Sequence, residues 1–244
     1  METKFLLTIA GFDPTGGAGI IRDVRTFSRF GFLSCAVITV NTVQNTKGVR
    51  KVEFTNGEFL LQQLDAVLEE ADIAGVKIGI PHDSLKVNRE IAEKLAHLNV
   101  PVVFDPVLSP TFGKSFVEKV DILKPLLSVP SVITPNFEEF RRMEEFFSDF
   151  SGYAVVKGIP EKNTVADRLL EFKGGKGQLI AEERHPRDEK VVRGTGCAFS
   201  SAFLAYLAAG RPVTEAFKGA VNFIRNYREK SFRRDGMEQY YSLL

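Results

Sequence analysis

The sequence predicts a three-layer α/β/α fold built around a mostly parallel central sheet, and two observations predict it. Short apolar runs rich in β-branched residues recur along the chain, and stretches with helical spacing of apolar residues lie between them. Strands that alternate with helices form βαβ units, because each long crossover brings the next strand back parallel. Such a sheet is covered by helices on both faces.

The predicted parallel strands are apolar on nearly every residue, as is typical of strands buried on both faces. They are FLLTIA at 5–10, SCAVITV at 34–40, IAGVKIG at 73–79, VPVVFDPV at 100–107, SVITP at 131–135 and GYAVVKG at 152–158.

Helices are predicted between these strands. In residues 18–31, Val24 and Phe27 fall close to one stripe, and residues 56–71 show the same spacing. A third helix is expected over 201–210, where the apolar segment SAFLAYLAAG follows a glycine turn.

Three shorter, more polar runs interrupt the alternation. GVRKVEF at 48–54 predicts a flap, whereas DRLLEF at 167–172 and QLIAEERH at 178–185, joined by the glycine turn KGGKG, predict a small antiparallel edge hairpin. Neither a low-complexity linker nor an internal repeat divides the chain, so one domain is expected over residues 1–244.

Composition excludes several classes of function. With 32 basic and 31 acidic residues the formal net charge is +1, which disfavours nucleic acid or a membrane as the main partner. The basic stretch at 225–234 is interrupted by an acidic residue and is expected to be a solvated helical face. The apolar run near the N-terminus is too short for a signal peptide or a membrane span, and Cys35 and Cys197 form no C-x-x-C pattern. A cytoplasmic location is expected.

Polar, glycine-rich segments follow the predicted strands. These segments are AGFDPTGGAGI at 10–20, NTVQNTKGV at 41–49, DPVLSPTFGKS at 105–115, TPNFEE at 134–139 and KGIPE at 157–161. Ligands of open parallel sheets bind beyond the carboxyl ends of the strands, so these loops should converge on one edge. This clustering predicts an enzyme.

The first glycine loop admits two interpretations. Gly11, Gly16, Gly17 and Gly19 let backbone amides approach a ligand at a helix start, or they serve only a tight strand-to-helix turn. The loop lacks the Lys-Ser/Thr of a Walker A sequence and does not match G-x-G-x-x-G. P-loop nucleotidases and dinucleotide enzymes are therefore disfavoured.

The turn Gly194-Thr195-Gly196-Cys197 lies at the start of the third predicted helix. Unpaired amides and the helix dipole would hold an anion there and stabilise charge on a transferring phosphoryl group. The same field should lower the pKa of Cys197 and favour a thiolate able to take a proton. The alternative is a small buried cysteine that fills a helix start.

Three charged residues follow strands and suit phosphate chemistry. Asp105 and Glu139 could hold Mg²⁺, through water in part, and Lys157 could face phosphate oxygens. Each has a structural alternative: a turn cap for Asp105, a first-turn helix carboxylate for Glu139 and a surface charge for Lys157.

Several stretches together resemble one family. TIAGFDPTGGAGIIRDVRTF, VITVNTVQNT, DPVL, TPNFEEF and RGTGCAFSSAFLAYLA are similar to the hydroxymethylpyrimidine and hydroxymethylpyrimidine-phosphate kinases of thiamine biosynthesis, in the ribokinase-like superfamily. The similarity runs from Thr8 to about Gly210. It implies an ATP- and magnesium-dependent kinase with an α/β/α fold that acts on a pyrimidine bearing a hydroxymethyl or phosphomethyl group. A homodimer is a family expectation.

The resemblance also implies roles for individual residues. Cys197 would be the base, or a positioner of the accepting oxygen, in an anion hole made by Gly194, Thr195 and Gly196. The residues that fall where the family contacts the pyrimidine are Gly11, Asp23, Gln44, Ile80 and Val107. The phosphate and nucleotide side would comprise Thr134, Asn136, Lys157 and the lid residue Lys114, with Asp105 and Glu139 associated with magnesium.

Departures from the family pattern keep alternatives open. Arg193 stands where a small residue or histidine is expected, and it would either contact phosphate or cover the turn. Phe12 replaces a small hydroxyl residue, which could narrow the pocket, and the region between Glu139 and Tyr153 is short. A kinase for pyridoxal or a related ring is the first alternative, and a non-catalytic pyrimidine sensor is the second.

Overall fold

The computed structural model describes residues 4–109, 116–117, 119–188 and 190–244. Within these residues one sheet runs in the order β3-β2-β1-β4-β5-β6-β7-β8-β9. Its strands are β1 (Phe5–Phe12), β2 (Leu33–Asn45), β3 (Gly48–Phe54), β4 (Ile73–Ile78), β5 (Val102–Phe104), β6 (Val132–Ile133), β7 (Gly152–Pro160), β8 (Thr164–Lys173) and β9 (Lys176–Pro186).

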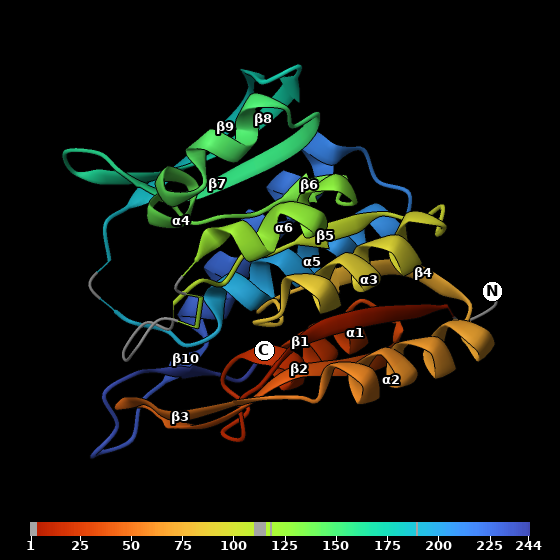
Figure 1. Ribbon diagram of the computed structural model, residues 1–244. Coiled ribbons are helices and arrows are strands. Elements are labelled where there is room, and N and C mark those ends of the chain that lie inside the picture. Colours follow the sequence, from red (N-terminus) through yellow and green to blue (C-terminus); the bar gives the residue numbers. More distant parts are fainter. Residues whose placement is uncertain (1–3, 110–115, 118, 189) are drawn as a thin grey trace.

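The sheet is parallel from β2 to β7 and antiparallel at both edges. β3 folds back on β2 at one edge, and β7, β8 and β9 pair antiparallel at the other, where the β8–β9 hairpin stands out from the body (Figure 1). The predicted fold class is confirmed, with the polar runs at 48–54, 167–172 and 178–185 as the antiparallel strands.

Helices cover both faces of the sheet (Figure 1). α1 (Gly19–Arg29), α5 (Thr195–Ala208) and α6 (Val213–Glu229) bury one core, in which Phe27 of α1 and Phe203 of α5 are fully covered. The second core is built on α2 and α3 together with the shorter helices. These elements are α2 (Gly57–Glu70), α3 (Leu85–Ala96), η1 (Val120–Ser128), α4 (Phe137–Arg142) and η2 (Glu144–Ser148).

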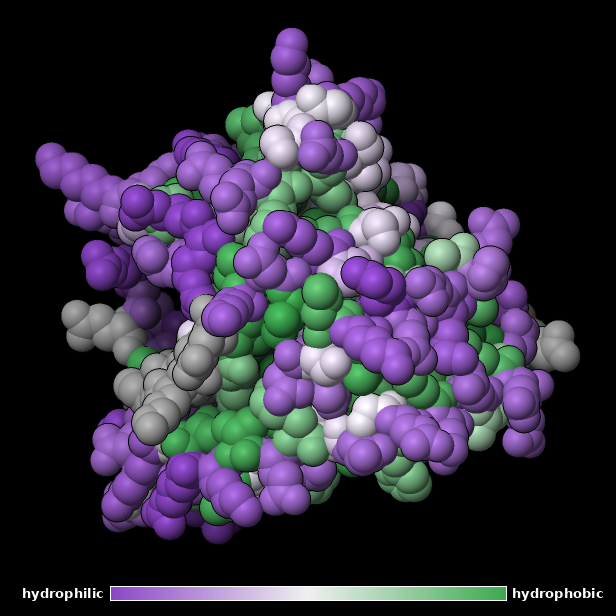
Figure 2. Space-filling model, viewed as in Figure 1, coloured by the Kyte–Doolittle hydropathy of each residue, from purple (hydrophilic) through white to green (hydrophobic). Residues whose placement is uncertain are grey.

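The helices α2 and α3 form where the sequence provides an apolar face and an N-terminal capping residue. Asn56 caps α2 by accepting from the Phe59 amide, and Ser84 caps α3. α5 differs because it is apolar all round and lies buried between the sheet and α6. Figure 2 shows the side of the molecule that carries α2 and α3, where hydrophilic side chains cover most of the surface and apolar ones show between them.

The chain ends in a segment that the sequence did not predict to be ordered. β10 (Ser231–Phe232) pairs antiparallel with β11 (Tyr241–Ser242), and Tyr240 bridges Val192 next to the start of α5. The C-terminus therefore lies beside the glycine turn. Within the described residues, no helix is long and apolar enough to cross a bilayer.

Candidate active site

A cavity of about 760 Å³ lies at the carboxyl ends of the parallel strands. Residues from the loops after β1, β4, β5 and β6 line it, together with residues near the ends of β2 and β7 and the start of α5. The predicted convergence of the polar loops on one edge is confirmed.

Most of the predicted site residues line this cavity. They are Gly11, Gln44, Ile80, Asp105, Val107, Asn136, Glu139, Lys157, Gly194, Thr195, Gly196 and Cys197. Asp23 and Thr134 are fully buried and lie behind the lining residues rather than among them. Lys114 falls outside the described residues.

The turn before α5 is held open by glycine. Gly194 has φ +71°, and a Cβ on it would lie 2.1 Å from the carbonyl oxygen of Gly17, so a side chain is excluded. The first helical hydrogen bond of α5 runs from the Ala198 amide to the Gly194 carbonyl. The amides of Thr195, Gly196 and Cys197 therefore precede the helical ladder and are available to an anion in the cavity.

The structure overturns the predicted acidity of Cys197. Burial raises the pKa of its thiol to about 11, and the nearby carboxylates of Asp23 and Asp105 raise it further, although Lys77 and the Gly19 amide act in the opposite direction. The expectation of a lowered pKa is wrong because the loss of hydration exceeds the helix-start field. Cys197 is a neutral thiol near neutral pH.

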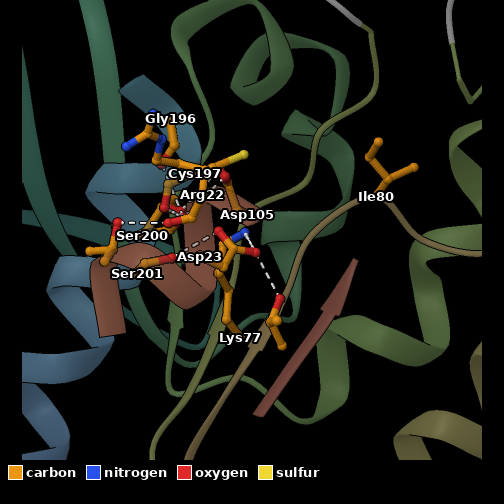
Figure 3. A network of polar contacts seen from close by, with 12 residues as sticks. Arg22, Asp23, Lys77, Ile80, Asp105, Gly196, Cys197, Ser200 and Ser201 are labelled. Atoms are coloured by element: carbon orange, nitrogen blue, oxygen red, sulfur yellow. Dashed lines mark hydrogen bonds and ion pairs between the residues drawn. The ribbon is translucent and has the colours of Figure 1, made fainter. Parts of the chain in front are cut away.

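A buried ion pair lies beneath this thiol, and sequence reasoning missed its lysine. Lys77 Nζ lies 2.9 Å from Asp23 Oδ2, and neither side chain has exposed surface. Thr8 and Ser201 also donate to Asp23. Figure 3 shows Lys77 and Asp23 facing each other close to Cys197, with Ile80 set apart.

The pKa values of both members of this pair are raised, and in each of them the charge of the partner opposes the effect of burial. Burial raises the pKa of Asp23, and Lys77 counteracts that increase. Burial would lower the pKa of Lys77, but the charge of Asp23, the hydrogen bond to Asp23 and the other acidic groups nearby together outweigh it and raise the pKa. Lys77 thus stays charged, and because it lines the cavity it places a fixed positive charge near the anion hole. Its signal in the sequence was a lone lysine inside the apolar run IAGVKIG.

Asp105 and Lys157 form a second ion pair at the cavity wall. Lys157 Nζ lies 2.9 Å from Asp105 Oδ1, and the hydroxyls of Ser200 and Thr134 donate to the same carboxylate at 3.1 and 3.3 Å. Burial alone would raise the pKa of Asp105, but Lys157 and Lys77 lower it below its ordinary value. A Cβ on Gly196 would lie 3.6 Å from Lys157 Nζ, so this pair adjoins the anion hole.

Glu139 both caps a helix and lines the cavity. It forms a capping box with Asn136, because its Oε2 accepts from the Asn136 amide and the Asn136 Oδ1 accepts from its amide, both at 2.8 Å. Burial raises the pKa of Glu139 to about 7, and Lys157 counteracts the shift in part. Glu139 is therefore a first-turn helix carboxylate, as the structural alternative predicted, and it also lines the cavity.

The carboxylates suit one kind of metal site. Nowhere in the described residues do three or more histidine, cysteine, aspartate or glutamate side chains gather as a closed cage. Mg²⁺ keeps much of its water and is held by one or two carboxylates with substrate phosphates. Asp105 and Glu139, with Lys157 beside them for phosphate oxygens, fit that donor set.

The first glycine loop is closed by its own aspartate. Asp13 accepts from the Thr15 amide at 2.9 Å and from the Ala18 amide at 3.0 Å. Gly19 has φ +57°, and a Cβ there would lie 2.2 Å from the Gly11 carbonyl oxygen. Here the tight-turn interpretation describes the loop better, since the amides of Thr15 and Ala18 are already bound.

Comparison with known proteins decides the family. The sequence model of the family described as phosphomethylpyrimidine kinase matches residues 13–240. The hydroxymethylpyrimidine/phosphomethylpyrimidine kinase of Bacillus subtilis is 34% identical, covering 92% of this chain and 89% of its own. The chain belongs to the phosphomethylpyrimidine kinase family. It is a phosphotransferase, and its family implies ATP as the co-substrate.

Solved structures agree with this assignment. The crystal structure of phosphomethylpyrimidine kinase from Clostridium difficile 630 is 31% identical, with a TM-score of 0.75 over 92% of this chain and 99% of that one. The ADP complex of Bacillus subtilis pyridoxal kinase has a TM-score of 0.80 over 98% of this chain and 96% of its own, at 24% identity. The second likeness shows the fold alone.

The basic stretch that begins at Arg225 is largely exposed, as expected, and two of its arginines also reach the cavity. Arg225 and Arg228, in the basic stretch expected to be a solvated face, both line the cavity. Arg225 pairs with Glu183 at 3.0 Å and Arg228 with Asp188 at 2.7 Å. Residues near the end of the chain thus close the cavity against β9 and the loop that follows it.

Proposed function

We propose that the protein is an ATP- and magnesium-dependent kinase that phosphorylates 4-amino-5-hydroxymethyl-2-methylpyrimidine, its monophosphate, or both, in thiamine biosynthesis. One observation carries the proposal: the open amides of Thr195, Gly196 and Cys197 face the same cavity as Gln44 and the Asp105–Lys157 pair. An anion hole, a phosphate-binding cation and a polar reader of a ring are thereby assembled in one place. The proposal treats the chain as one kinase domain.

The residues divide the work of phosphoryl transfer. The first-turn amides of α5 and the charge of Lys77 stabilise negative charge on the transferring group, which is the main task in this chemistry. Lys157 would give up its ion pair with Asp105 and contact phosphate oxygens instead. The carboxylates of Asp105 and Glu139 would then be available to hold magnesium. The metal supplies charge neutralisation on the phosphates when bound.

Cys197 has a positioning role in this proposal. A neutral thiol with a pKa of about 11 is a poor base at pH 7. A phosphate monoester needs little deprotonation to act as a nucleophile, so the second phosphorylation tolerates such a group. For the hydroxymethyl substrate, Cys197 would hold the accepting oxygen at the anion hole.

The wall of the ring pocket combines apolar contacts with one amide. Gly11 packs so closely that a Cβ there would lie 2.7 Å from Ile80 Cδ1 and 2.9 Å from Val40 Cγ1. Ile80 and Val107 offer apolar surface to a flat ring, and Gln44 offers a polar group at its edge. Asp23 contributes from behind the wall, through Lys77.

The experiment that tests this proposal is ATP consumption with Mg²⁺ in separate reactions with hydroxymethylpyrimidine, its monophosphate and pyridoxal. Turnover of either pyrimidine above pyridoxal supports the proposal. A clear preference for pyridoxal contradicts it, and binding of the pyrimidine without any ATP consumption would identify a sensor instead.

The cytoplasmic location and the homodimer stay predictions. Sedimentation of the purified protein at micromolar concentration distinguishes a dimer from the 27.2 kDa monomer.

A further inference from the structure

The start of α5 has no capping side chain. Gly194 stands at the capping position, and no side chain there accepts from the first amides of the helix. In many helices a serine, aspartate or asparagine at this position accepts from one of those amides and holds the first turn in place. Such a cap would occupy an amide that the anion hole uses. The first turn of α5 therefore needs a support that leaves its amides unbound.

The residue before this turn is held through its backbone. The Tyr227 hydroxyl, on α6, donates to the Arg193 carbonyl at 2.7 Å. The Arg193 amide donates to the Tyr240 carbonyl at 2.9 Å, and the Tyr240 amide donates to the Val191 carbonyl at the same distance. Both backbone groups of Arg193 are therefore bonded to residues from later parts of the chain.

The Arg193 side chain is fixed as well. It is only 8% exposed, and its terminal nitrogens donate to Asp13 Oδ2 at 2.7 Å and to Gln239 Oε1 at 2.6 Å. They also donate to Gln44 Oε1 and to the Asn45 carbonyl, both at 3.1 Å. Of the two roles considered from the sequence, the guanidinium covers the turn, with four protein acceptors around its terminal nitrogens.

The Tyr227 hydroxyl keeps its proton and stays a donor to this carbonyl. The side chain has no exposed surface, and burial raises the pKa of its phenol to about 12, although the charge of Arg22 opposes the shift. The Arg22 guanidinium lies over the ring, with Cζ 4.9 Å from the centroid, and donates to the carbonyls of Ser242 and Leu244. The last residues of the chain thus hold Arg22, which holds the ring of Tyr227.

Gly194 lies between two fixed peptide planes. The Arg193 carbonyl shares a rigid plane with the Gly194 amide, and Tyr227 holds that plane from one side. On the helix side, the Gly194 carbonyl accepts from the Ala198 amide. Glycine has little conformational preference of its own, so these two contacts select its φ of +71°. The first turn is thus kept in place while its amides stay open.

We propose that Tyr227 is a positioning residue for phosphoryl transfer, because its hydrogen bond to the Arg193 carbonyl holds the first turn of α5 in place of a capping side chain. Tyr227 is fully buried and is not one of the described residues that line the cavity. It acts through the amides at 195–197, whose directions it maintains. The inference rests on the proposed function for the identity of the substrate, and it adds α6 to the elements that build the anion hole.

Tyr227→Phe tests the proposal, since it removes the hydroxyl and keeps the ring beside Arg22. The first turn of α5 should then spend less time in the conformation that binds the transferring group. With hydroxymethylpyrimidine or its monophosphate, kcat should fall about tenfold, while KM for the pyrimidine and for ATP stays within about twofold. Tyr206→Phe is the matched control and should keep the wild-type kcat, because it removes a hydroxyl from a ring of α5 that packs on α6 at Gly219.

Calorimetric binding of ADP with fluoroaluminate and Mg²⁺ gives a readout that needs no turnover. Fluoroaluminate resembles a phosphoryl group in transfer, so it should occupy the anion hole, whereas ADP alone should not. Tyr227→Phe should bind ADP–fluoroaluminate about tenfold more weakly than the wild type does, and ADP equally well. A hydrogen bond that served stability alone would lower the thermal unfolding midpoint and leave the ratio of the two affinities unchanged.

The outcomes separate this inference from the proposed function. Wild-type kcat in Tyr227→Phe, or an unchanged affinity ratio, overturns the role of Tyr227 while pyrimidine turnover by the wild type still supports the kinase. No turnover of either pyrimidine by the wild type contradicts the proposed function, and the fluoroaluminate measurement then decides the inference by itself. A wild type that binds ADP–fluoroaluminate no more tightly than ADP also overturns the inference.

Discussion

Two glycine-rich turns of this protein lead from the sheet edge into a helix, and they differ in what occupies their amides. After β1, Asp13 accepts from the amides of Thr15 and Ala18, so the loop satisfies itself. Before α5, the Thr195 and Gly196 amides lie ahead of the first helical hydrogen bond and line the cavity. A glycine loop at a helix start therefore keeps amides open to an anion only where the chain supplies no carboxylate of its own.

The largest effect is expected on the free energy of unfolding, when the first glycine loop loses the aspartate that binds its amides. Asp13→Ala removes the acceptor of two amides and leaves Arg193 buried without its ion-pair partner. Loss of one partner of a buried pair costs about 3–5 kcal/mol. Urea denaturation measures this change, and Asp65→Ala, at a half-exposed ion pair between α2 and α3, is the control. A loss no greater than in the control would show that the loop does not depend on Asp13.

Closing the open turn should abolish most activity. Gly194→Ala forces a side chain into a residue with φ +71° and places its Cβ 2.1 Å from a carbonyl oxygen. This displaces the Thr195 and Gly196 amides that follow it. The expected result is a fall in kcat of about 10²–10³-fold, as for the loss of a comparable charge-stabilising donor. Gly210→Ala is the matched control, because its φ is +76° and nothing lies within 4 Å of the added Cβ. Equal turnover in the two variants would contradict the role given to this turn.

The thiol in the open turn should affect turnover more than binding. Cys197→Ala should lower kcat by about tenfold and leave pyrimidine affinity within about twofold, because a neutral thiol positions the substrate oxygen rather than taking its proton. Cys197→Asp should retain part of the activity. Full kcat in Cys197→Ala with both pyrimidines would remove this residue from the mechanism.

The last prediction concerns the pH dependence of stability at α4, a third helix start, which its own capping box closes. Glu139 has a pKa of about 7 in the folded protein against an ordinary 4.5, so the folded state keeps a proton that the unfolded state releases. This carboxyl therefore lowers stability progressively as pH rises from 4.5 to 7, with the full cost above 7 and none below 4.5.

Urea denaturation of wild type and Glu139→Gln between pH 4 and pH 8, without metal or nucleotide, measures this dependence. The stability of the wild type relative to the variant should fall across that range. A difference that does not vary with pH would show that Glu139 is charged throughout.

The sequence was most informative where the signal is local. Apolar runs and helical spacing predicted the parallel sheet, and the glycines of the turn at 194–197 predicted the open helix start, since both follow from backbone conformation and periodicity. The order of loops after strands predicted which residues share the cavity. Asp23 was assigned to the cavity wall because its motif is there, but the burial of α1 against α5 sets it one layer back.

The sequence alone thus determined the fold class, the edge of the sheet at which the loops meet and the glycine turn whose amides are open at the start of α5. Tertiary structure decided the pKa of Cys197, the pairing of Lys77 with Asp23 and the arrival of Gln239 from the far end of the chain. The physical reason is the separation along the sequence over which each kind of interaction acts. Strand, helix and turn preferences act between neighbours in sequence, whereas desolvation and charge pairing depend on residues that only folding brings together.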